Sequence, residues 1–228
     1  MTSNVLAIVP ARGGSKGIPM KNIMPLSGKP LLAYNLQSAL QTPSITRLVV
    51  STDDQQIADV AKEYGSEVVW RPPELGGDSA TSESALLHTI QWLQESENYK
   101  SDIIVFLQCT SPLTLPEDIE GTIQALISNQ ADSALAVAPF HYFLWGYGKE
   151  NEVIAINHDK YYRPRRQDRE PQYVETGAVY VMRTDGFLKA KHRFFGKIAM
   201  YNMPIQRRLE IDDLVDMQIA EVLLAGSL

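Results

Sequence analysis

The chain is poor in the residues that mark several classes of protein. Among its 228 residues there is one cysteine, Cys109, so no disulfide can form within the chain, and we expect this residue to be packed beside a strand. No apolar stretch approaches the roughly 20 residues of a membrane-spanning helix. The apolar run at residues 5–10 is too short for a secretory leader. We therefore predict a cytoplasmic protein without a membrane partner.

Positive charge and histidine are also scarce. The formal net charge is -6, and an acidic chain has no general attraction for nucleic acid, so we expect no nucleic-acid partner. A phosphate-bearing ligand would need a local basic site. No metal-ligand or catalytic-triad spacing is formed by the four histidines, which are His88, His141, His158 and His192.

Short apolar runs alternate with segments of helical spacing along most of the chain. Such alternation indicates an α/β fold with a mostly parallel, doubly wound sheet of the Rossmann-like type, and we treat residues 1–228 as a single domain. The strands are predicted at residues 5–9, 48–50, 68–70, 103–107, 134–137, 178–181 and 197–203. The helices are predicted at residues 31–40, 55–64, 82–95, 116–127, 186–190 and 213–224.

One segment, residues 139–172, interrupts this alternation. It holds many aromatic and arginine residues and shows no strand–helix period. We interpret it as an inserted lid or dimerisation element. Ligands of doubly wound sheets bind beyond the carboxyl ends of the strands. The loops that follow the first and fourth predicted strands are therefore the places to look for a site.

The loop after the first strand, residues 10–22, combines three glycines with the cations Arg12, Lys16 and Lys21. Glycines let backbone amides approach an anion closely, and clustered cations offset its charge. The pattern is neither the P-loop nor the dinucleotide-binding fingerprint. A solvated surface loop is the alternative. Its place directly after a buried strand favours binding of a triphosphate.

An acidic segment precedes the last predicted helix. Glu210 and Asp212 alternate, so in an extended segment they share a side and could hold Mg²⁺ together with substrate phosphates. The alternative is that Asp212 or Asp213 caps the helix. Both hold if Asp212 binds the metal and Asp213 caps.

Five segments in consistent order resemble the acylneuraminate cytidylyltransferases, the CMP-sialic acid synthetases. The resemblance extends from about residue 5 to residue 225, and the long first-loop motif is specific. It implies a magnesium-dependent homodimer that transfers CMP from CTP to the anomeric hydroxyl of a nine-carbon acidic sugar. The five segments are residues 10–22, 71–82, 107–113, 163–168 and 210–212.

The resemblance also implies roles for single residues. Arg12 and Lys21 would grip the CTP phosphates, and Asp212 with Glu210 would hold Mg²⁺, which makes Lys21, Arg12 and Asp212 the catalytic set. The implied nucleotide site comprises Ala11, Arg12, Gly13, Ser15, Lys16, Lys21, Asn22, Arg71, Ala80 and Ser82. Alternatives are a surface salt bridge for Arg71 and a helix cap for Ser82. Asp53 could orient the first loop, and Asp54 could cap the second helix.

For the sugar, the resemblance implies a polar floor, an apolar wall and an arginine for the sugar carboxylate. In this family the insertion can reach across a dimer, so the arginine could serve the neighbouring subunit. Packing in the core is the alternative for the three aromatic residues. The implied sugar site comprises Gln108, Thr110, Ser111, Tyr180, Phe194, Phe195 and Arg165, with Arg166 as the alternative arginine.

Some positions depart from the family pattern. Cys109 and Thr114 stand where many members have proline and arginine, and Glu175-Thr176-Gly177 stands where many have Asn-Gly. Legionaminate, pseudaminate, a deaminated sialic acid and 3-deoxy-octulosonate therefore remain alternative substrates. A sensor of CTP or sugar and a purely structural module are the alternatives outside enzymes.

Overall fold

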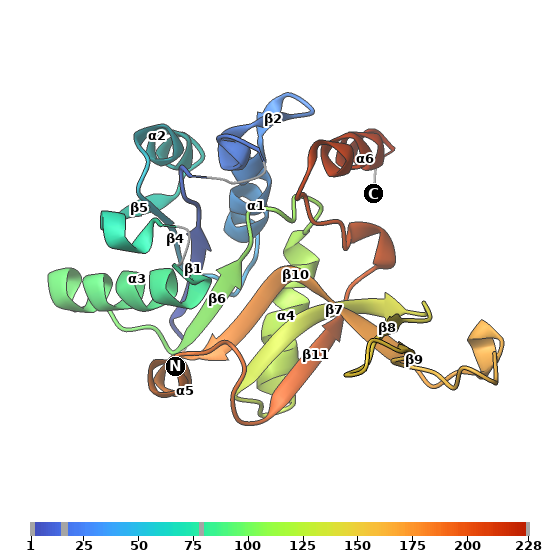
Figure 1. Ribbon diagram of the computed structural model, residues 1–228. Coiled ribbons are helices and arrows are strands. Elements are labelled where there is room, and N and C mark those ends of the chain that lie inside the picture. The colour runs from blue at the N-terminus through green and yellow to red at the C-terminus, as the bar shows by residue number, and fades with distance from the viewer. Residues whose placement is uncertain (1–2, 15–17, 78–79, 227–228) are drawn as a thin grey trace.

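A computed structural model describes residues 3–14, 18–77 and 80–226 of the chain. Its centre is a seven-stranded sheet of order β11-β7-β10-β6-β1-β4-β5 (Figure 1). All seven predicted strands are present. They are β1 (Val5–Pro10), β4 (Arg47–Thr52), β5 (Glu67–Trp70), β6 (Ile103–Leu107), β7 (Ser133–Phe140), β10 (Gln172–Arg183) and β11 (Ile198–Asn202).

The sheet is mostly parallel, as predicted, and β10 is the exception. It runs antiparallel to both of its neighbours, β6 and β7. The segment between β7 and β10 contains no crossover helix that would carry the chain back to the other end of the sheet. The chain therefore enters β10 at the edge where β7 ends, and an antiparallel strand is the result.

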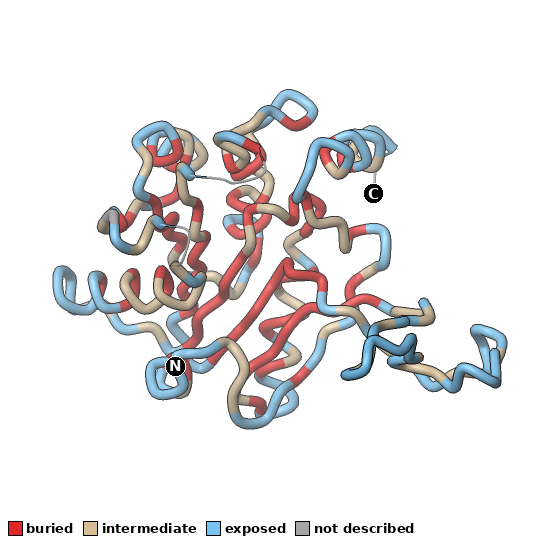
Figure 2. Tube along the Cα trace, viewed as in Figure 1, coloured by how far each residue is buried: buried red, intermediate tan, exposed pale blue. Residues whose placement is uncertain are grey.

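In the part of the chain that the structure describes, six α-helices contribute to the core layers on the two faces of the sheet. Alternate residues of each central strand enter opposite layers, as Leu6 and Ala7 of β1 do, and Figure 2 shows buried residues along the length of these strands. One core layer includes side chains of α1, α2, α4 and α6, and the other includes side chains of α3 and α5. The helices are α1 (Leu31–Leu40), α2 (Gln55–Glu63), α3 (Ser82–Glu97), α4 (Pro116–Ser128), α5 (Thr184–Ala190) and α6 (Leu214–Ala225).

The first residues of α2, α3 and α6 show which side chain caps each helix, a question that the sequence left open. Asp54 caps α2 by accepting from Ile57 N at 3.0 Å. Asp213 caps α6 within a capping box, so its carboxylate has a structural role beside Asp212. The cap of α3 is Thr81, and Ser82 is the first helical residue, so the prediction of Ser82 as the cap is wrong. Backbone geometry selects Thr81, because it is the residue with extended φ and ψ.

The inserted segment forms an arm that projects from the carboxyl end of β7 (Figure 1). Phe140 and Gln172 pair with each other in the main sheet, so the arm proper comprises residues 141–171. It holds the antiparallel hairpin of β8 (Trp145–Tyr147) and β9 (Val153–Ala155) and the short helix η3 (Arg166–Asp168). Among the helices that the structure describes, none has the length and apolar character needed to cross a bilayer.

Candidate active site

Two segments far apart in the chain meet at the carboxyl edge of the sheet. Lys21 lies in the 3-10 helix η1 (Lys21–Ile23), and its Nζ donates to the carbonyl oxygen of Ile211 at 2.8 Å. The same atom lies 3.3 Å from Asp212 Oδ1. The Lys21 side chain is 12% exposed, whereas that of Asp212 is 77% exposed. The first loop and the acidic segment therefore form one site, with a held ammonium group beside an accessible carboxylate.

The first loop is tied to its neighbours by hydrogen bonds. Asn22 Nδ2 donates to Arg12 O at 2.9 Å, and Gly13 N donates to Asp53 Oδ1 at 3.1 Å, so Asp53 orients the loop as predicted. A Cβ at Gly13 would lie 2.9 Å from Asp54 Oδ2, so this position favours glycine. Ser15 and Lys16, which we predicted to bind nucleotide, lie outside the described residues.

A cavity of about 290 Å³ opens between this loop and the start of α3. Six residues of the predicted nucleotide site line it, and the cations Arg12, Lys21 and Arg71 are among them. Such a hollow suits an anionic, phosphate-bearing ligand. Ala11 is buried beneath the loop. The lining residues are Pro10, Arg12, Lys21, Asn22, Arg71, Ala80, Thr81, Ser82 and Thr110.

Arg71 is buried, so the surface salt-bridge interpretation of this residue is wrong. Its Nη2 donates to Ser51 O at 2.7 Å and its Nη1 donates to Leu75 O at 3.3 Å. Burial lowers the pKa of the guanidinium, and the nearby charge of Asp53 opposes that shift. Backbone carbonyls therefore hold Arg71 in place, and a positive charge faces the cavity.

Glu210 is fixed from two sides. Its Oε1 accepts from Gln108 Nε2 at 2.7 Å and from Thr110 Oγ1 at 3.2 Å. Burial raises the pKa of this carboxyl group, and the hydrogen bond from Thr110 works against that rise. Gly177 lies against its other oxygen, because a Cβ there would come within 2.8 Å of Glu210 Oε2. The predicted sugar residues Gln108 and Thr110 thus position a carboxylate.

The described residues contain no cluster of three or more His, Cys, Asp and Glu side chains that could hold a metal by itself. Mg²⁺ commonly uses only one or two carboxylates and takes its remaining ligands from water and substrate phosphates. Glu210 and Asp212, beside a cavity lined by cations, fit a metal ion that binds together with a triphosphate.

The predicted apolar wall is part of a packed layer. Tyr180 is 2% exposed, and its ring stacks on Phe106 with centroids 5.3 Å apart. Phe194 meets Tyr180 edge to face at 5.9 Å, and Phe195 packs against the same layer. Tyr180 is therefore a core residue with a polar tip, since its hydroxyl donates to Glu175.

Two predicted sugar residues lie apart from this group. Ser111 is 1% exposed, beside Asn35 of α1, so a ligand cannot reach its hydroxyl in this conformation. Arg165 is on the arm, where its 75% exposed side chain pairs with Asp168. Neither residue lines the cavity beside Lys21.

Arg193 is a residue that sequence reasoning missed. Its guanidinium lies 4.5 Å from the ring centre of Tyr180 and 4.9 Å from that of Phe106. Its Nε also donates to Glu83 Oε1 at 2.7 Å. The position of Arg193 directly before Phe194 and Phe195 was the signal that could have indicated it. Its partner Glu83 is 110 residues away in the chain, so the sequence did not indicate the pair.

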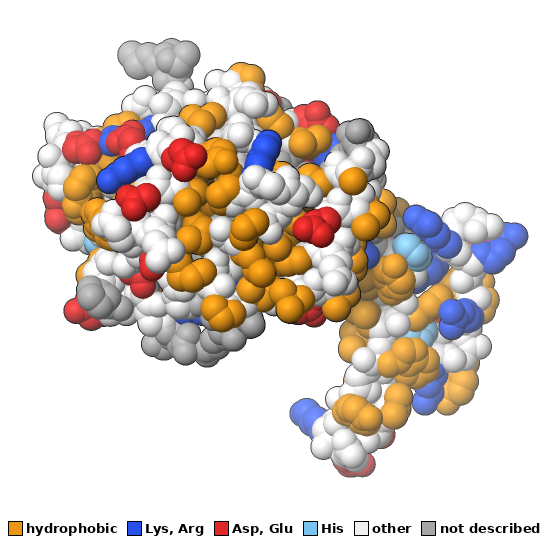
Figure 3. Space-filling view, turned by 90° about the horizontal axis from the view of Figure 1, so that it is seen from above, with side chains coloured by type: hydrophobic (Ala, Val, Ile, Leu, Met, Phe, Trp, Pro, Cys, Tyr) orange, Lys and Arg blue, Asp and Glu red, His pale blue; other side chains and the backbone are white. Residues whose placement is uncertain are grey.

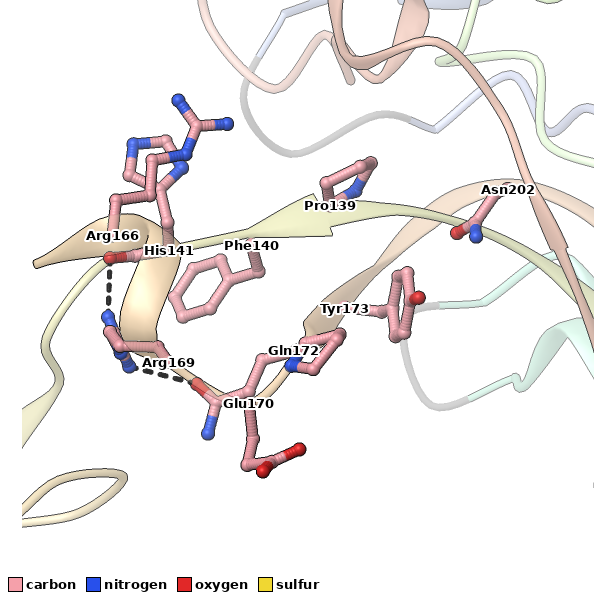
Figure 4. A pocket seen from close by; sticks show the side chains of 10 residues that line it. Pro139, Phe140, His141, Arg166, Arg169, Glu170, Gln172, Tyr173 and Asn202 are labelled. Carbon is pink, nitrogen blue, oxygen red and sulfur yellow. Dashed lines mark hydrogen bonds between the residues drawn. The ribbon is translucent and has the colours of Figure 1, made fainter.

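A second hollow lies at the base of the arm and shares no lining residue with the first (Figure 4). Arg169 closes one side of it by donating to His141 O at 2.6 Å and to Gln172 Oε1 at 3.2 Å. Arg166, Tyr173 and other side chains complete the lining. Figure 3 shows Lys and Arg side chains gathered on the arm and hydrophobic side chains gathered in the middle of the main body.

Comparison with known proteins identifies the group to which this fold and site belong. The family model described as "Cytidylyltransferase" matches residues 6–222. The chain belongs to the cytidylyltransferase family. The predicted family and the predicted class of enzyme, a nucleotidyltransferase, are thereby confirmed.

Several curated cytidylyltransferases are similar over nearly the whole chain. The pseudaminic acid cytidylyltransferase of Campylobacter jejuni serotype O:23/36 is 33% identical over 221 residues, which are 96% of this chain and 95% of that protein. The N-acylneuraminate cytidylyltransferase of Oncorhynchus mykiss is 34% identical over 96% of this chain and 50% of that protein. This cytidylyltransferase therefore spans about half the length of the fish relative.

Solved structures show the same fold. A CMP:2-keto-3-deoxy-manno-octonic acid synthetase complexed with CTP superimposes with a TM-score of 0.73 at 17% identity, covering 99% of this chain and 100% of that chain. A 4-diphosphocytidyl-2C-methyl-D-erythritol synthase from Anaerococcus prevotii gives 0.71 at 13% identity, covering 99% and 100%. At these identities the likeness establishes the Rossmann-like fold of this cytidylyltransferase.

Proposed function

We propose that this cytidylyltransferase transfers CMP from CTP to the anomeric hydroxyl of a nine-carbon acidic sugar such as N-acetylneuraminate, and releases pyrophosphate. The observation that carries the proposal is the junction of Lys21 with Ile211 and Asp212 beside a cavity lined by Arg12 and Arg71. Relatives named for acidic nine-carbon sugars support the choice of acceptor.

In the proposed reaction the anomeric hydroxyl releases its proton to water, and its oxygen forms a bond to the α-phosphorus of CTP. The bond from that phosphorus to the bridging oxygen breaks, and its electron pair leaves with pyrophosphate. Lys21 and Arg12 offset the negative charge that develops on the phosphates. Catalysis rests on positioning and charge, and the hydrogen bond to Ile211 O holds the Lys21 ammonium in place beforehand.

The residues that would hold Mg²⁺ are Asp212 and Glu210. When bound, the ion would neutralise phosphate charge and lower the pKa of the attacking hydroxyl. Gln108 and Thr110 orient the Glu210 carboxylate by donating to it, as outer partners of metal ligands commonly do.

Pseudaminate is the second candidate acceptor. A relative named for pseudaminic acid is 33% identical and matches this chain almost end to end. Legionaminate, a deaminated sialic acid and 3-deoxy-octulosonate require the same chemistry and belong in the same panel.

The proposal includes a cytoplasmic homodimer. The arm exposes large aromatic side chains, and Arg165 is exposed and does not line its own subunit's cavity, which suits contact with a second copy. In that arrangement Arg165 would bind the sugar carboxylate of the neighbouring subunit through paired hydrogen bonds. The exposed aromatic residues include Tyr142, Trp145, Tyr147, Tyr161 and Tyr162.

The test is pyrophosphate release from CTP, with and without Mg²⁺, across a panel of nine-carbon and eight-carbon acidic sugars. Metal-dependent release with a nine-carbon sugar supports the proposal and names the substrate. Binding of CTP without release for any sugar would favour a sensor and contradict the proposal.

A further inference from the structure

A bulge in β10 separates Glu175 from the rest of its strand. Glu175 pairs with Val137 of β7, and pairing resumes only at Tyr180 and Leu135. Residues 176–179 therefore stand opposite Ala136 alone, and Gly177 takes a positive φ of 70°. Bulges of this kind redirect side chains near binding sites. Here the bulge lies against Glu210, which contacts Gly177, so Glu175 sits at the rim of the proposed active site.

The Glu175 carboxylate is held by one of its two oxygens. The Tyr180 hydroxyl donates to Oε1, and burial of the ring, followed by the bond to Glu175, raises the pKa of Tyr180. Tyr180 therefore stays protonated and keeps donating. Glu175 is itself exposed, and within the described part of the chain no group donates to its Oε2. One oxygen is therefore bonded within the protein, and the other is available to a ligand.

A chain of contacts connects the residues that support Glu175 to the cavity beside Lys21. Arg193 lies over the Tyr180 ring and is paired with Glu83, whose side chain is 14% exposed. Glu83 follows Ser82, which lines that cavity. Arg193 pairs with Glu83, and among the described residues it forms no ion pair with Glu175. The neighbouring Thr176 cannot replace Glu175, since it is buried and donates to Ala136 O.

Building on the proposed function, we propose that Glu175 determines sugar specificity by accepting a hydrogen bond from an N–H or O–H group on a substituent of the acidic sugar. An ionised carboxylate is an acceptor only, so it matches a donor on the ligand. It also repels the sugar's own carboxylate, which is thereby directed toward the other end of the site. Sites that hydrogen-bond a substrate group discriminate strongly against analogues that lack it.

The experiment compares the wild type with Glu175→Gln, which keeps the size of the side chain and removes its charge. The kcat and KM values are measured for CTP and for each sugar in a panel whose members differ in one amino, acylamino or hydroxyl substituent. We expect the KM for the best sugar to rise by about tenfold or more. The KM for CTP should stay within about twofold, and the increase should differ among the sugars, so that their order of preference changes.

Glu63→Gln is the matched control, because it makes the same chemical change at the exposed last residue of α2. Unchanged sugar KM values, or an equal rise for every sugar, would overturn the proposal. If Glu175→Gln does not fold, the variant to use is Glu175→Asp, which keeps the charge but shortens the side chain. An unaltered order of preference among the sugars would again refute the proposal. A wild type that binds CTP but turns over no sugar shows instead that the proposed function fails, and the specificity role falls with it.

Discussion

The nucleotide cavity and the arm differ in how far a single chain completes them. Arg71 and Lys21 are held by backbone carbonyls of distant segments before any ligand arrives. Arg165, by contrast, is largely exposed, and among the described residues its side chain bonds only to Asp168, three positions away. The proposed CTP chemistry needs fixed charges, and the cavity has them within one chain, as Arg12, Lys21 and Arg71. In the homodimer that we propose, the arm would become part of a site only when a second copy covers it.

The largest expected effect tests the cavity, whose charged side chains are held in place within one chain. Lys21→Ala removes the ammonium group beside the proposed α-phosphate position, so kcat should fall by about 10²–10³-fold. The circular dichroism spectrum and Tm should remain close to those of the wild type. Lys62→Ala, at an exposed position of α2, is the control. Near-normal turnover would remove Lys21 from the catalytic set.

The second effect concerns the metal. Asp212→Asn removes a carboxylate charge from an exposed position and should raise the Mg²⁺ concentration needed for half-maximal activity by about tenfold or more. The measurement is a magnesium titration at saturating CTP, with Asp59→Asn as the exposed control. An unchanged titration would place the metal elsewhere.

A third prediction tests whether the arm acts across two subunits. Arg165→Ala should raise the KM for sugar more than the KM for CTP, by about tenfold. If the arginine serves the neighbouring subunit, mixing this variant with Lys21→Ala should restore part of the activity, because some mixed dimers then hold one intact site. A larger change in the KM for CTP would assign Arg165 to the nucleotide, and failure of the mixture would place its action within one chain.

The smallest expected effect is on stability, and it distinguishes the role of Asp213 from that of the adjacent Asp212. Asp213→Ala removes the cap of α6 and should lower the free energy of unfolding by about 1 kcal/mol. Denaturant unfolding measures this, and Asp54→Ala, which removes the cap of α2, should give a similar loss. Asp212→Asn should leave stability nearly unchanged. Equal destabilisation by Asp212→Asn would mean that Asp212 also supports the helix.

Local patterns predicted most of the scaffold. Buried runs such as residues 103–107 predicted strands, and the glycines and cations of residues 10–22 predicted the loop that lines the cavity. The predictions of the strands, and of Asp54 and Asp213 as caps, succeeded because strand burial and capping depend on residues that are close in sequence. Thr81 was missed as a cap because two adjacent hydroxyl residues offer the same chemistry and only backbone geometry separates them.

Local sequence patterns could not predict contacts between residues that are distant in the chain. No sequence period pairs Arg193 with Glu83, or places Gly177 against Glu210. Ser111 looked accessible in its motif, yet the packing of α1 against the loop buries it. The reversal of β10 follows from where the arm returns the chain to the sheet.

The sequence by itself determined the alternating fold, the family and the two charged segments, because each depends on short-range periodicity or on a compact motif. Only the tertiary structure decided that Lys21 meets Asp212, that Asp213 rather than Asp212 caps α6, and that Glu175 stands on a buried tyrosine at the rim. Those outcomes depend on the packing of segments up to about 190 residues apart, where burial and hydrogen-bond geometry select one partner among many.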